Sequence, residues 1–522
     1  MSAASSIPPA AEAGPAAGTP EAVIEQGHRE SSGAPTEQRL VKRALSLGAA
    51  GAIDYGLQFL LPVVLTRCLD ADAFGQYRVL WLAAGTVMAI VTMSVPGSLY
   101  YYLPRSGAGD KRLYINQALL FLAGAGMLAA WAVSPWNPLL PEMMRGFPPN
   151  EAILPVFMLL WMVSWLLDVL PAAEERVAWQ ARATVALSAL RAVALSLTAW
   201  LTGELGPVLL VLVAFIAIKV GVLLFYIAKY HGLRGPVMRK TAFADQLHHA
   251  GLFSVASTLY MLQAQADQWI AATLFSMAMF ASFSVAAVVA PLVNLCRQSM
   301  NYAFLPTMSR CHSDGDIPGM VDLNRRANVI VGTLIYPLLA FAFVFAEEIV
   351  TLVYTATYID AAPVMRMYVL GLAAMAVETG TVTLQLRQGR QQLIMSAWLL
   401  ALSIPLSWLG AHQFGLPGAA LGSVTAIFLD RYFTLRMMAD KTAIPIRRLQ
   451  DWRSLGLWVA FGTTAALCAW GVVELSLPAA GPLSRLALAG ACMALVYGAL
   501  QVCFGIGRAQ LTAILTRKES LI

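Results

Sequence analysis

The chain has 522 residues, of which 58% are hydrophobic and 12% are charged, and its mean hydropathy is +0.66. A soluble domain carries about 25% charged residues, so this composition excludes a soluble globular protein. The formal net charge is +6 at pH 7, but the basic residues are concentrated in short loops between apolar runs, and we expect no nucleic-acid partner.

The first 40 residues differ from the rest of the chain. They are rich in Ala, Pro, Gly, Ser and Glu and have few bulky apolar residues. They also lack the basic and apolar regions of a signal peptide. We therefore predict that residues 1–40 form a disordered cytoplasmic tail outside the fold.

Apolar runs of about 20 residues recur from residue 44 almost to the C-terminus, and each is long enough to cross a hydrocarbon core as a helix. They predict an all-α polytopic membrane protein with about 14 transmembrane helices. The predicted spans are 44–66, 77–103, 113–134, 152–170, 183–202, 206–229, 249–275, 281–308, 327–346, 363–386, 392–410, 416–438, 454–474 and 483–506.

The distribution of Lys and Arg predicts the orientation, because cytoplasmic loops carry an excess of both. With the N-terminus inside, the cytoplasmic segments hold 26 of the 35 basic residues. The outer loops and their helix ends hold Arg67, Arg78, Arg145, Arg366 and Arg485. We therefore expect both termini to be cytoplasmic.

Landmarks recur along the chain at a nearly constant offset, which indicates an internal repeat. The sequence FGQY at 74–77 precedes the second predicted helix, and FASF at 280–283 begins the eighth, 206 positions later. Leu103-Pro104 and Leu305-Pro306 end the same two helices, 202 positions apart. Because each repeat holds six helices, an even number, the two halves enter the membrane in the same direction and form parallel lobes.

The repeat predicts four regions of the chain. After the tail come an N-terminal lobe at 41–240 and a C-terminal lobe at 241–440. Two further helices and a short cytoplasmic C-terminus occupy 441–522.

Nine ionisable residues fall inside the predicted spans, where a charge costs about 2.5–3.5 kcal/mol at the bilayer centre unless it meets a partner or water. They are Asp54, Asp168, Arg191, Lys219, Asp267, Arg297, Glu378, Asp430 and Arg431. Several belong to polar stripes on spans 44–66, 249–275 and 281–308. We therefore expect these three helices to line an aqueous cavity between the lobes.

The cations in these stripes predict an anionic substrate, because the planar guanidinium of Arg can bond two oxygens of one oxyanion. Arg297 is the strongest candidate, and a structural ion pair is the alternative role for it. The other predicted substrate-binding residues are Asn294, Asn301, Lys219, Arg191, Gln263 and Tyr260.

The sequence leaves two possible roles open for the carboxylates inside the spans. Asp267 either relays H⁺ or Na⁺ as a coupling ion or is a counter-charge to Arg297 or Lys219. Asp54 and Glu378 are candidates for the same roles. The six cysteines are scattered without metal-site spacing, and we expect neither a metal nor another cofactor.

Five segments resemble the polysaccharide biosynthesis (O-antigen flippase-like) transporters of the multidrug/oligosaccharidyl-lipid/polysaccharide exporter superfamily, abbreviated MOP. The resemblance covers roughly residues 40–510, and it departs from the family pattern at Phe283, where Tyr is commoner. The segments are LDADAFGQY (69–77), QADQWIAATL (265–274), FSVAA (283–287), AFLPTMS (303–309) and AEEIVTLVYTATYIDAAPVMRMY (346–368).

The resemblance implies a flippase of the bacterial inner membrane that moves undecaprenyl-pyrophosphate-linked oligosaccharides for exopolysaccharide or lipopolysaccharide synthesis, beside a polysaccharide polymerase and export machinery. A cation-coupled multidrug exporter is the alternative, against which the mid-span cations argue. An integral-membrane glycosyltransferase, polymerase or ligase is a third reading. No predicted loop is long enough for the catalytic platform that such an enzyme needs, so we expect no enzyme.

The predicted topology is testable with reporter fusions. A reporter that is active only in the cytoplasm should work after Ile522 and within 230–248. A reporter that is active only outside should work within 137–147 and 355–361. An outward C-terminus would contradict the even number of helices and with it the parallel repeat.

Overall fold

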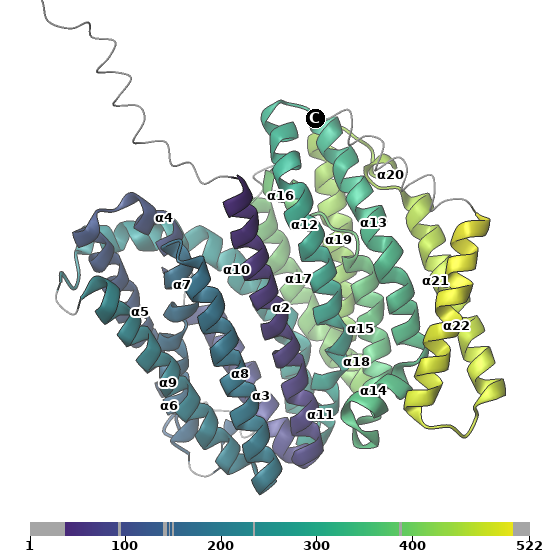
Figure 1. Cartoon of the computed structure of the whole chain (residues 1–522), viewed down its shortest axis with the longest axis horizontal. Coiled ribbons are helices and arrows are strands. Elements are labelled where there is room, and N and C mark those ends of the chain that lie inside the picture. Colours follow the sequence, from purple (N-terminus) through teal and green to yellow (C-terminus); the bar gives the residue numbers. More distant parts are fainter. Residues whose placement is uncertain are drawn as a thin grey trace, which may run out of the picture.

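The computed structural model describes residues 37–91, 95–138, 144–145, 147–148, 151–232, 235–385 and 389–504, and these residues fold almost entirely as helices (Figure 1). Ten of the described helices are long and apolar enough to cross a membrane. The all-α polytopic class is therefore confirmed, while the count of about 14 spans stays a prediction. Most of the predicted tail, up to residue 36, lies outside the described residues.

The N-terminal lobe consists of α2 to α9 and one 3₁₀ helix, η1. Each predicted span in this part of the chain falls on one helix or on two consecutive helices. The elements are α2 (Glu37–Cys68), α3 (Ala71–Val91), α4 (Val95–Tyr102), η1 (Leu103–Arg105), α5 (Ala108–Ala132), α6 (Ile153–Ser164), α7 (Leu166–Ala173), α8 (Val177–Thr202) and α9 (Leu205–His231).

The C-terminal lobe and the two last helices follow. The elements are α10 (Lys240–Leu274), α11 (Met277–Val285), η3 (Ala286–Val289), α12 (Ala290–Ser313), α13 (Ile317–Val344), α14 (Ala346–Tyr354), η4 (Ala356–Tyr358), α15 (Ala361–Met375), α16 (Gly380–Gln385), α17 (Gly389–Phe414), α18 (Leu416–Ala419), α19 (Leu421–Thr442), α20 (Ile446–Leu449), α21 (Trp452–Ser476) and α22 (Pro482–Cys503). Figure 1 shows α21 and α22 beside the second lobe.

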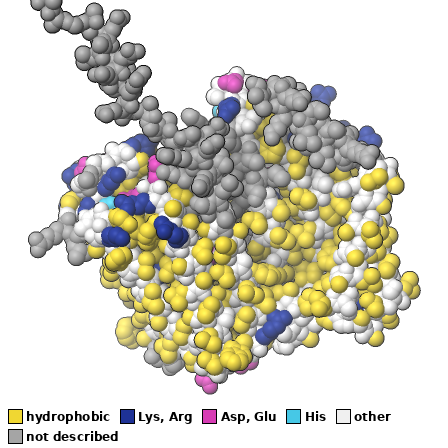
Figure 2. All heavy atoms as spheres, viewed as in Figure 1, with side chains coloured by type: hydrophobic (Ala, Val, Ile, Leu, Met, Phe, Trp, Pro, Cys, Tyr) yellow, Lys and Arg dark blue, Asp and Glu magenta, His cyan; other side chains and the backbone are white. Residues whose placement is uncertain are grey.

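We call the end of the molecule at which α2 begins the inner end and the opposite end the outer end, after the predicted orientation. On the face drawn in Figure 2, apolar side chains cover a broad band between the two ends. Lys and Arg gather mainly toward the inner end on this face. Both features fit a multi-pass membrane protein, in which lipid contacts the apolar band.

The predicted span 363–386 is not one continuous helix, which corrects the sequence reading. It divides into α15 and α16, with Glu378 in the break between them. The side chain of Asn328, on α13, forms hydrogen bonds with the backbone N–H and carbonyl groups of Glu378 in this break. Its amide nitrogen donates to the carbonyl oxygen of Glu378 at 2.9 Å, and its oxygen accepts from the N–H of Glu378 at 3.0 Å. Irregular backbone at membrane depth requires such internal partners.

The two lobes meet toward the outer end through contacts between α3 and α11. The carboxylate of Asp72 accepts a hydrogen bond of 3.0 Å from the backbone N–H of Ala278, and Arg78 donates to the carbonyl oxygen of Ser284 at 3.3 Å. Each pair is separated by 206 positions, the same offset as the sequence landmarks. Residues that contact their own repeat equivalents must lie near the axis that relates the repeats.

A further contact closes the outer end beside this axis. The guanidinium of Arg67, at the end of α2, donates to the carbonyl oxygens of Leu352 and Val353 at 2.6 and 2.5 Å. Both carbonyls belong to the last turn of α14, whose negative dipole end attracts a cation. We call the Asp72, Arg78 and Arg67 contacts together the outer contact.

The packing between the lobes departs from the symmetry of the repeat. On one side α10 packs against α3 and α4, and it donates from the hydroxyl of Thr258 to the carbonyl of Ala89 and from the amide of Gln246 to the hydroxyl of Ser98. The repeat-equivalent side would pair α2 with α11 and α12. There a cavity of about 360 Å³ separates α2 from η3 and α12.

A compact polar cluster fixes the inner end of the N-terminal lobe. The hydroxyl of Tyr226 donates to Glu174 at 2.5 Å, and the imidazole of His231 lies 2.7 Å from the other carboxylate oxygen. Burial by itself would raise the pKa of Glu174, but these two contacts and the charge of Arg176 outweigh burial and lower that pKa. The cluster ties the turn between α7 and α8 to the end of α9.

Candidate functional site

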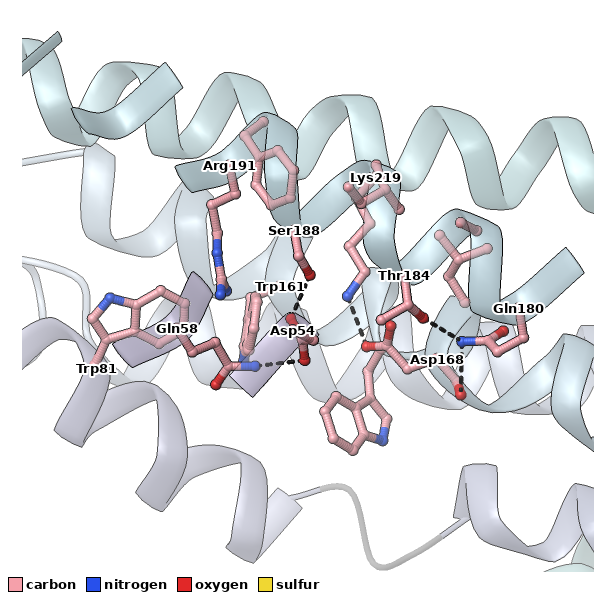
Figure 3. A pocket seen from close by; sticks show the side chains of 15 residues that line it. Asp54, Gln58, Trp81, Trp161, Asp168, Gln180, Thr184, Ser188, Arg191 and Lys219 are labelled. Atoms are coloured by element: carbon pink, nitrogen blue, oxygen red, sulfur yellow. Dashed lines mark hydrogen bonds and ion pairs between the residues drawn. The ribbon is translucent and has the colours of Figure 1, made fainter. Parts of the chain in front are cut away.

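A cavity of about 460 Å³ lies within the N-terminal lobe, and we call it the N-lobe cavity (Figure 3). Its lining comes from α2, α3, α6, α7, α8 and α9, so it is enclosed by helices that are distant in sequence. The polar and charged lining residues are Asp54, Gln58, Asp168, Gln180, Thr184, Ser188, Arg191 and Lys219.

Three of the four charged groups in the N-lobe cavity have partners. The ammonium of Lys219 lies 2.7 Å from a carboxylate oxygen of Asp168 and forms an ion pair with it. Asp54 accepts from the amide of Gln58 at 2.7 Å and from the hydroxyl of Ser188. A charged acceptor strengthens each of these hydrogen bonds.

Arg191 is the exception. Within the part of the chain that the structure describes, its guanidinium has no hydrogen bond or ion pair, and its Nε is buried. Figure 3 shows the side chain extending from α8 into the cavity, toward Trp81 and Trp161. An anion could therefore approach this guanidinium without first separating it from a protein carboxylate.

Aromatic rings line the cavity beside these charges. Trp81 and Trp161 meet edge to face with their ring centroids 5.0 Å apart, and Phe157 stacks on Trp161 at 6.0 Å. The ammonium of Lys219 lies 5.5 Å from the centroid of the Trp161 ring, within the range of a cation–π interaction. Rigid rings next to a few fixed polar groups are typical of small-molecule sites.

A second cavity, of about 230 Å³, lies in the C-terminal lobe, and we call it the C-lobe cavity. Tyr260, Gln263, Asp267 and Asn294, all predicted from the sequence, are among its lining residues. Asp267 is 1% exposed, and its carboxylate accepts a hydrogen bond of 2.8 Å from the hydroxyl of Tyr368 and one from the N–H of Gln268.

The structure places Arg297 differently from the predicted arrangement. Its guanidinium pairs with Glu378 on the broken helix and donates to Asn294 at 3.3 Å. Lys219 pairs with Asp168. The reading of Asp267 as a counter-charge to Arg297 or Lys219 is therefore corrected, because both cations have another carboxylate. Both Arg297 and Glu378 are largely buried, which is the structural role that the sequence left open for Arg297.

A third cavity lies between the other two and shares lining residues with both. It is the cavity between α2 and α12, and its lining includes Gln58, which also lines the N-lobe cavity. Its lining also includes Asn294, which lines the C-lobe cavity. The third cavity therefore shares a lining residue with each of the other two, and we call the three together the interlobe cavities.

Sequence reasoning found most of the charged residues of these cavities but missed their arrangement. Asp54, Arg191 and Lys219 come together in the N-lobe cavity, while the side chain of Asn301 lies outside the described residues. Trp81, Trp161 and Ser188 were not predicted. Apolar or small side chains inside a span carry no signal that separates a cavity wall from lipid-facing or packed positions.

Comparisons with known proteins agree with this architecture. A family model described as polysaccharide biosynthesis protein matches residues 64–363. A comparison with curated protein sequences gives no match. Among solved structures, the chain is similar to the lipid II flippase MurJ in an inward closed conformation, with a TM-score of 0.63 and 12% identity over 88% of this chain and 98% of that chain.

Two other solved structures share the fold. One is a multidrug resistance MATE family transporter of the MOP superfamily, inward-facing, with a TM-score of 0.56 and 12% identity over 74% of this chain and 94% of that chain. The other is a MOP superfamily transporter from Pyrococcus furiosus that is described as having a binding pocket of reverse polarity, with a TM-score of 0.52 and 14% identity over 77% of this chain and 96% of that chain. At these identities the likeness shows a shared fold alone.

The pairing of Arg297 with Glu378 predicts a structural phenotype. Glu378→Gln leaves a buried guanidinium without its counter-charge, which costs about 3–5 kcal/mol for pairs of this kind. We expect lower membrane abundance and a lower midpoint of thermal unfolding in detergent. Adding Arg297→Met should restore most of both, because the unpaired charge is then removed.

The opposite pattern would contradict this assignment. If Glu378→Gln and Arg297→Met each leave abundance and thermal stability unchanged while export is lost, the pair belongs to the transport path. Arg297 would then regain the substrate-binding role that the sequence predicted.

Proposed function

We propose that this chain, which belongs to the polysaccharide biosynthesis protein family, is a flippase that moves undecaprenyl-pyrophosphate-linked oligosaccharides across the bacterial inner membrane by alternating access. The observation that carries the proposal is the unpaired Arg191 in the N-lobe cavity, beside Trp81 and Trp161. The proposal includes the predicted orientation, with both termini cytoplasmic, and a polysaccharide polymerase and export machinery as downstream partners.

The chemistry of the cavity suits the two parts of such a headgroup. A pyrophosphate presents several anionic oxygens, and a guanidinium can bond two of them at once. The apolar faces of sugar rings pack against aromatic rings, which Trp81 and Trp161 supply, while the amides of Gln58 and Gln180 provide hydrogen bonds to hydroxyl groups. The lipid tail would remain in the bilayer throughout the reaction.

The carboxylates are available for coupling to an ion gradient. Asp54 and Asp267 each accept hydrogen bonds from uncharged groups and have no ion pair among the described residues. Either carboxylate can therefore exchange H⁺ or Na⁺ without first breaking an ion pair. We propose both as coupling residues.

A cation-coupled multidrug exporter remains the second candidate, because the same Asp54 would attract a cationic drug. Lys219 neutralises Asp168, so one carboxylate and one guanidinium remain uncompensated in the N-lobe cavity. The two functions therefore differ in which of these groups is indispensable. A flippase needs Arg191 for the substrate, whereas an exporter of cations needs Asp54.

The test uses purified protein in proteoliposomes and a fluorescent lipid-linked oligosaccharide. Arg191→Ala should lower translocation at least about tenfold, since a charge-assisted hydrogen bond contributes about 1.5–3 kcal/mol. Arg191→Lys should restore part of the rate, because a point charge replaces the bidentate fork. Membrane abundance should not fall, because no protein group loses a partner.

Two controls test whether the loss is specific to Arg191 and to an anionic substrate. Arg182→Ala removes an exposed cation from the same helix, where its guanidinium donates to the carbonyl of Ala178, and it should leave translocation unchanged. A lipophilic cationic dye should not be transported. Normal translocation by Arg191→Ala would contradict the substrate-binding role of Arg191. Dye transport that depends on Asp54, without translocation of the lipid-linked oligosaccharide, would overturn the flippase proposal in favour of the exporter.

Alternating access requires that the outer contact open during transport. The contact is tight, because a Cβ atom added to Gly75 on α3 would overlap the carbonyl oxygen of Met277. Gly75→Ala should therefore destabilise the closed outer end by about 1–3 kcal/mol. A shift of this size changes the ratio of closed to open molecules by about 5- to 150-fold.

Double electron–electron resonance can measure this shift as a change in the distance between two spin labels. Trp136, after α5, and Leu475, near the end of α21 beside the C-terminal lobe, are 89% and 88% exposed, so labels at the outer end on either side report on opening. Gly75→Ala should add a population at longer distance. The matched control is Gly97→Ala, because an added Cβ there meets no atom within 4 Å. Identical distance distributions for the two variants would contradict a gating role for the outer contact.

A further inference from the structure

An amphipathic groove on the surface of the C-terminal lobe lies apart from the interlobe cavities. It runs between α17 and α19 near their inner ends and has a volume of about 380 Å³. None of its lining residues also lines an interlobe cavity. Its lining residues are Gln391, Ile394, Met395, Trp398, Phe433, Arg436, Met437, Asp440 and Lys441.

The groove arises because α17 and α19 pack closely only toward the outer end. There a Cβ atom on Gly422 would overlap the carbonyl oxygen of Ser403 and the hydroxyl of Ser407, and both serines are fully buried. Toward the inner end, large side chains replace these small residues. Trp398 is 74% exposed and Phe433 is 45% exposed, so apolar surface lines an open space.

Charged and apolar side chains occupy different parts of the groove, with the cations nearer the inner end. At 1.5 Å per residue, Trp398 and Phe433 each lie about 14 Å from the inner ends of their helices. Arg436 and Lys441 lie within about 9 Å of the inner end of α19 by the same rise. Cations near the membrane surface with apolar rings at greater depth match the headgroup and the acyl chains of a phospholipid.

The two cations are available for a ligand. In the described part of the chain neither Arg436 nor Lys441 forms a hydrogen bond or an ion pair, although Asp440 lies in the same groove. Two cations and one carboxylate leave a net positive charge. The carboxylate also faces any headgroup that binds the cations, so it favours a headgroup with hydroxyl donors.

We propose that this groove binds one acidic phospholipid from the leaflet at the inner end, with a phosphatidylglycerol headgroup as the best match. The phosphate bonds Arg436 and Lys441, a glycerol hydroxyl donates to Asp440, and the acyl chains lie along Trp398 and Phe433. The site does not depend on the proposed transport activity. The bound lipid stabilises the inner halves of α17 and α19, which pack incompletely against each other there.

The test is native mass spectrometry of the purified full chain with added dioleoyl lipids. Phosphatidylglycerol should bind more tightly than phosphatidylcholine or phosphatidylethanolamine. Replacing both Arg436 and Lys441 by Ala should weaken the tightest phosphatidylglycerol binding by about 30-fold, as expected for the loss of two surface cations. The matched control replaces Arg447 and Arg448 on α20, which are exposed at the same end, and should change binding less than 3-fold.

Two more variants separate the loss of lipid binding from a folding defect. Arg436→Lys with Lys441→Arg should keep the preference for phosphatidylglycerol. Trp398→Ala should weaken all three lipids equally, since it removes apolar contact and no charge. Equal losses in the two double-alanine variants, tighter binding of phosphatidylethanolamine, or displacement of phosphatidylglycerol by an equimolar polyprenyl phosphate would each overturn the proposal.

Discussion

The cost of an unpartnered polar group inside a membrane determines how this bundle is built. Several buried groups that would be expensive in lipid are met by a side chain from another helix. Arg297 pairs with Glu378, Lys219 pairs with Asp168, and the amide of Asn328 satisfies the backbone at the break between α15 and α16. Arg191 departs from this rule inside a cavity, and a substrate can supply the missing anion.

The arrangement of the two halves fits the predicted repeat in part and departs from its symmetry in part. Hydrogen bonds between positions 206 apart bring α3 and α11 together at the axis that relates the lobes. If the symmetry were complete, α2 would pack on α11 and α12 as α10 packs on α3 and α4. A cavity lies there instead, and it shares lining residues with the cavities of both lobes. The same asymmetry that prevents a closed bundle therefore leaves space between the lobes.

The sequence predicted the class of fold because hydropathy and loop charge are local properties of short segments. It also identified the charged cavity residues, because a charge inside a span is conspicuous. It could not predict which charges meet. Glu378 reaches Arg297 only because α15 and α16 separate at a break that Asn328 stabilises from 50 positions away, and no local pattern encodes that contact. The tryptophans of the N-lobe cavity were missed for a related reason, since an aromatic ring in a span suits lipid, protein or cavity equally well.

The pairing pattern also assigns different tasks to the two lobes. In the C-terminal lobe, Arg297 and Glu378 join α12 to the broken helix, and Arg431 donates to Thr379 in the same break at 2.7 Å, so cations there hold protein segments in place. In the N-terminal lobe, Lys219 and Asp168 compensate each other while Arg191 stays free. An anion that binds Arg191 does not have to displace a protein carboxylate, whereas one that binds Arg297 must separate it from Glu378. Competition with an existing ion pair lowers net affinity, so the N-terminal lobe is the side of the molecule on which an anionic headgroup gains most from binding.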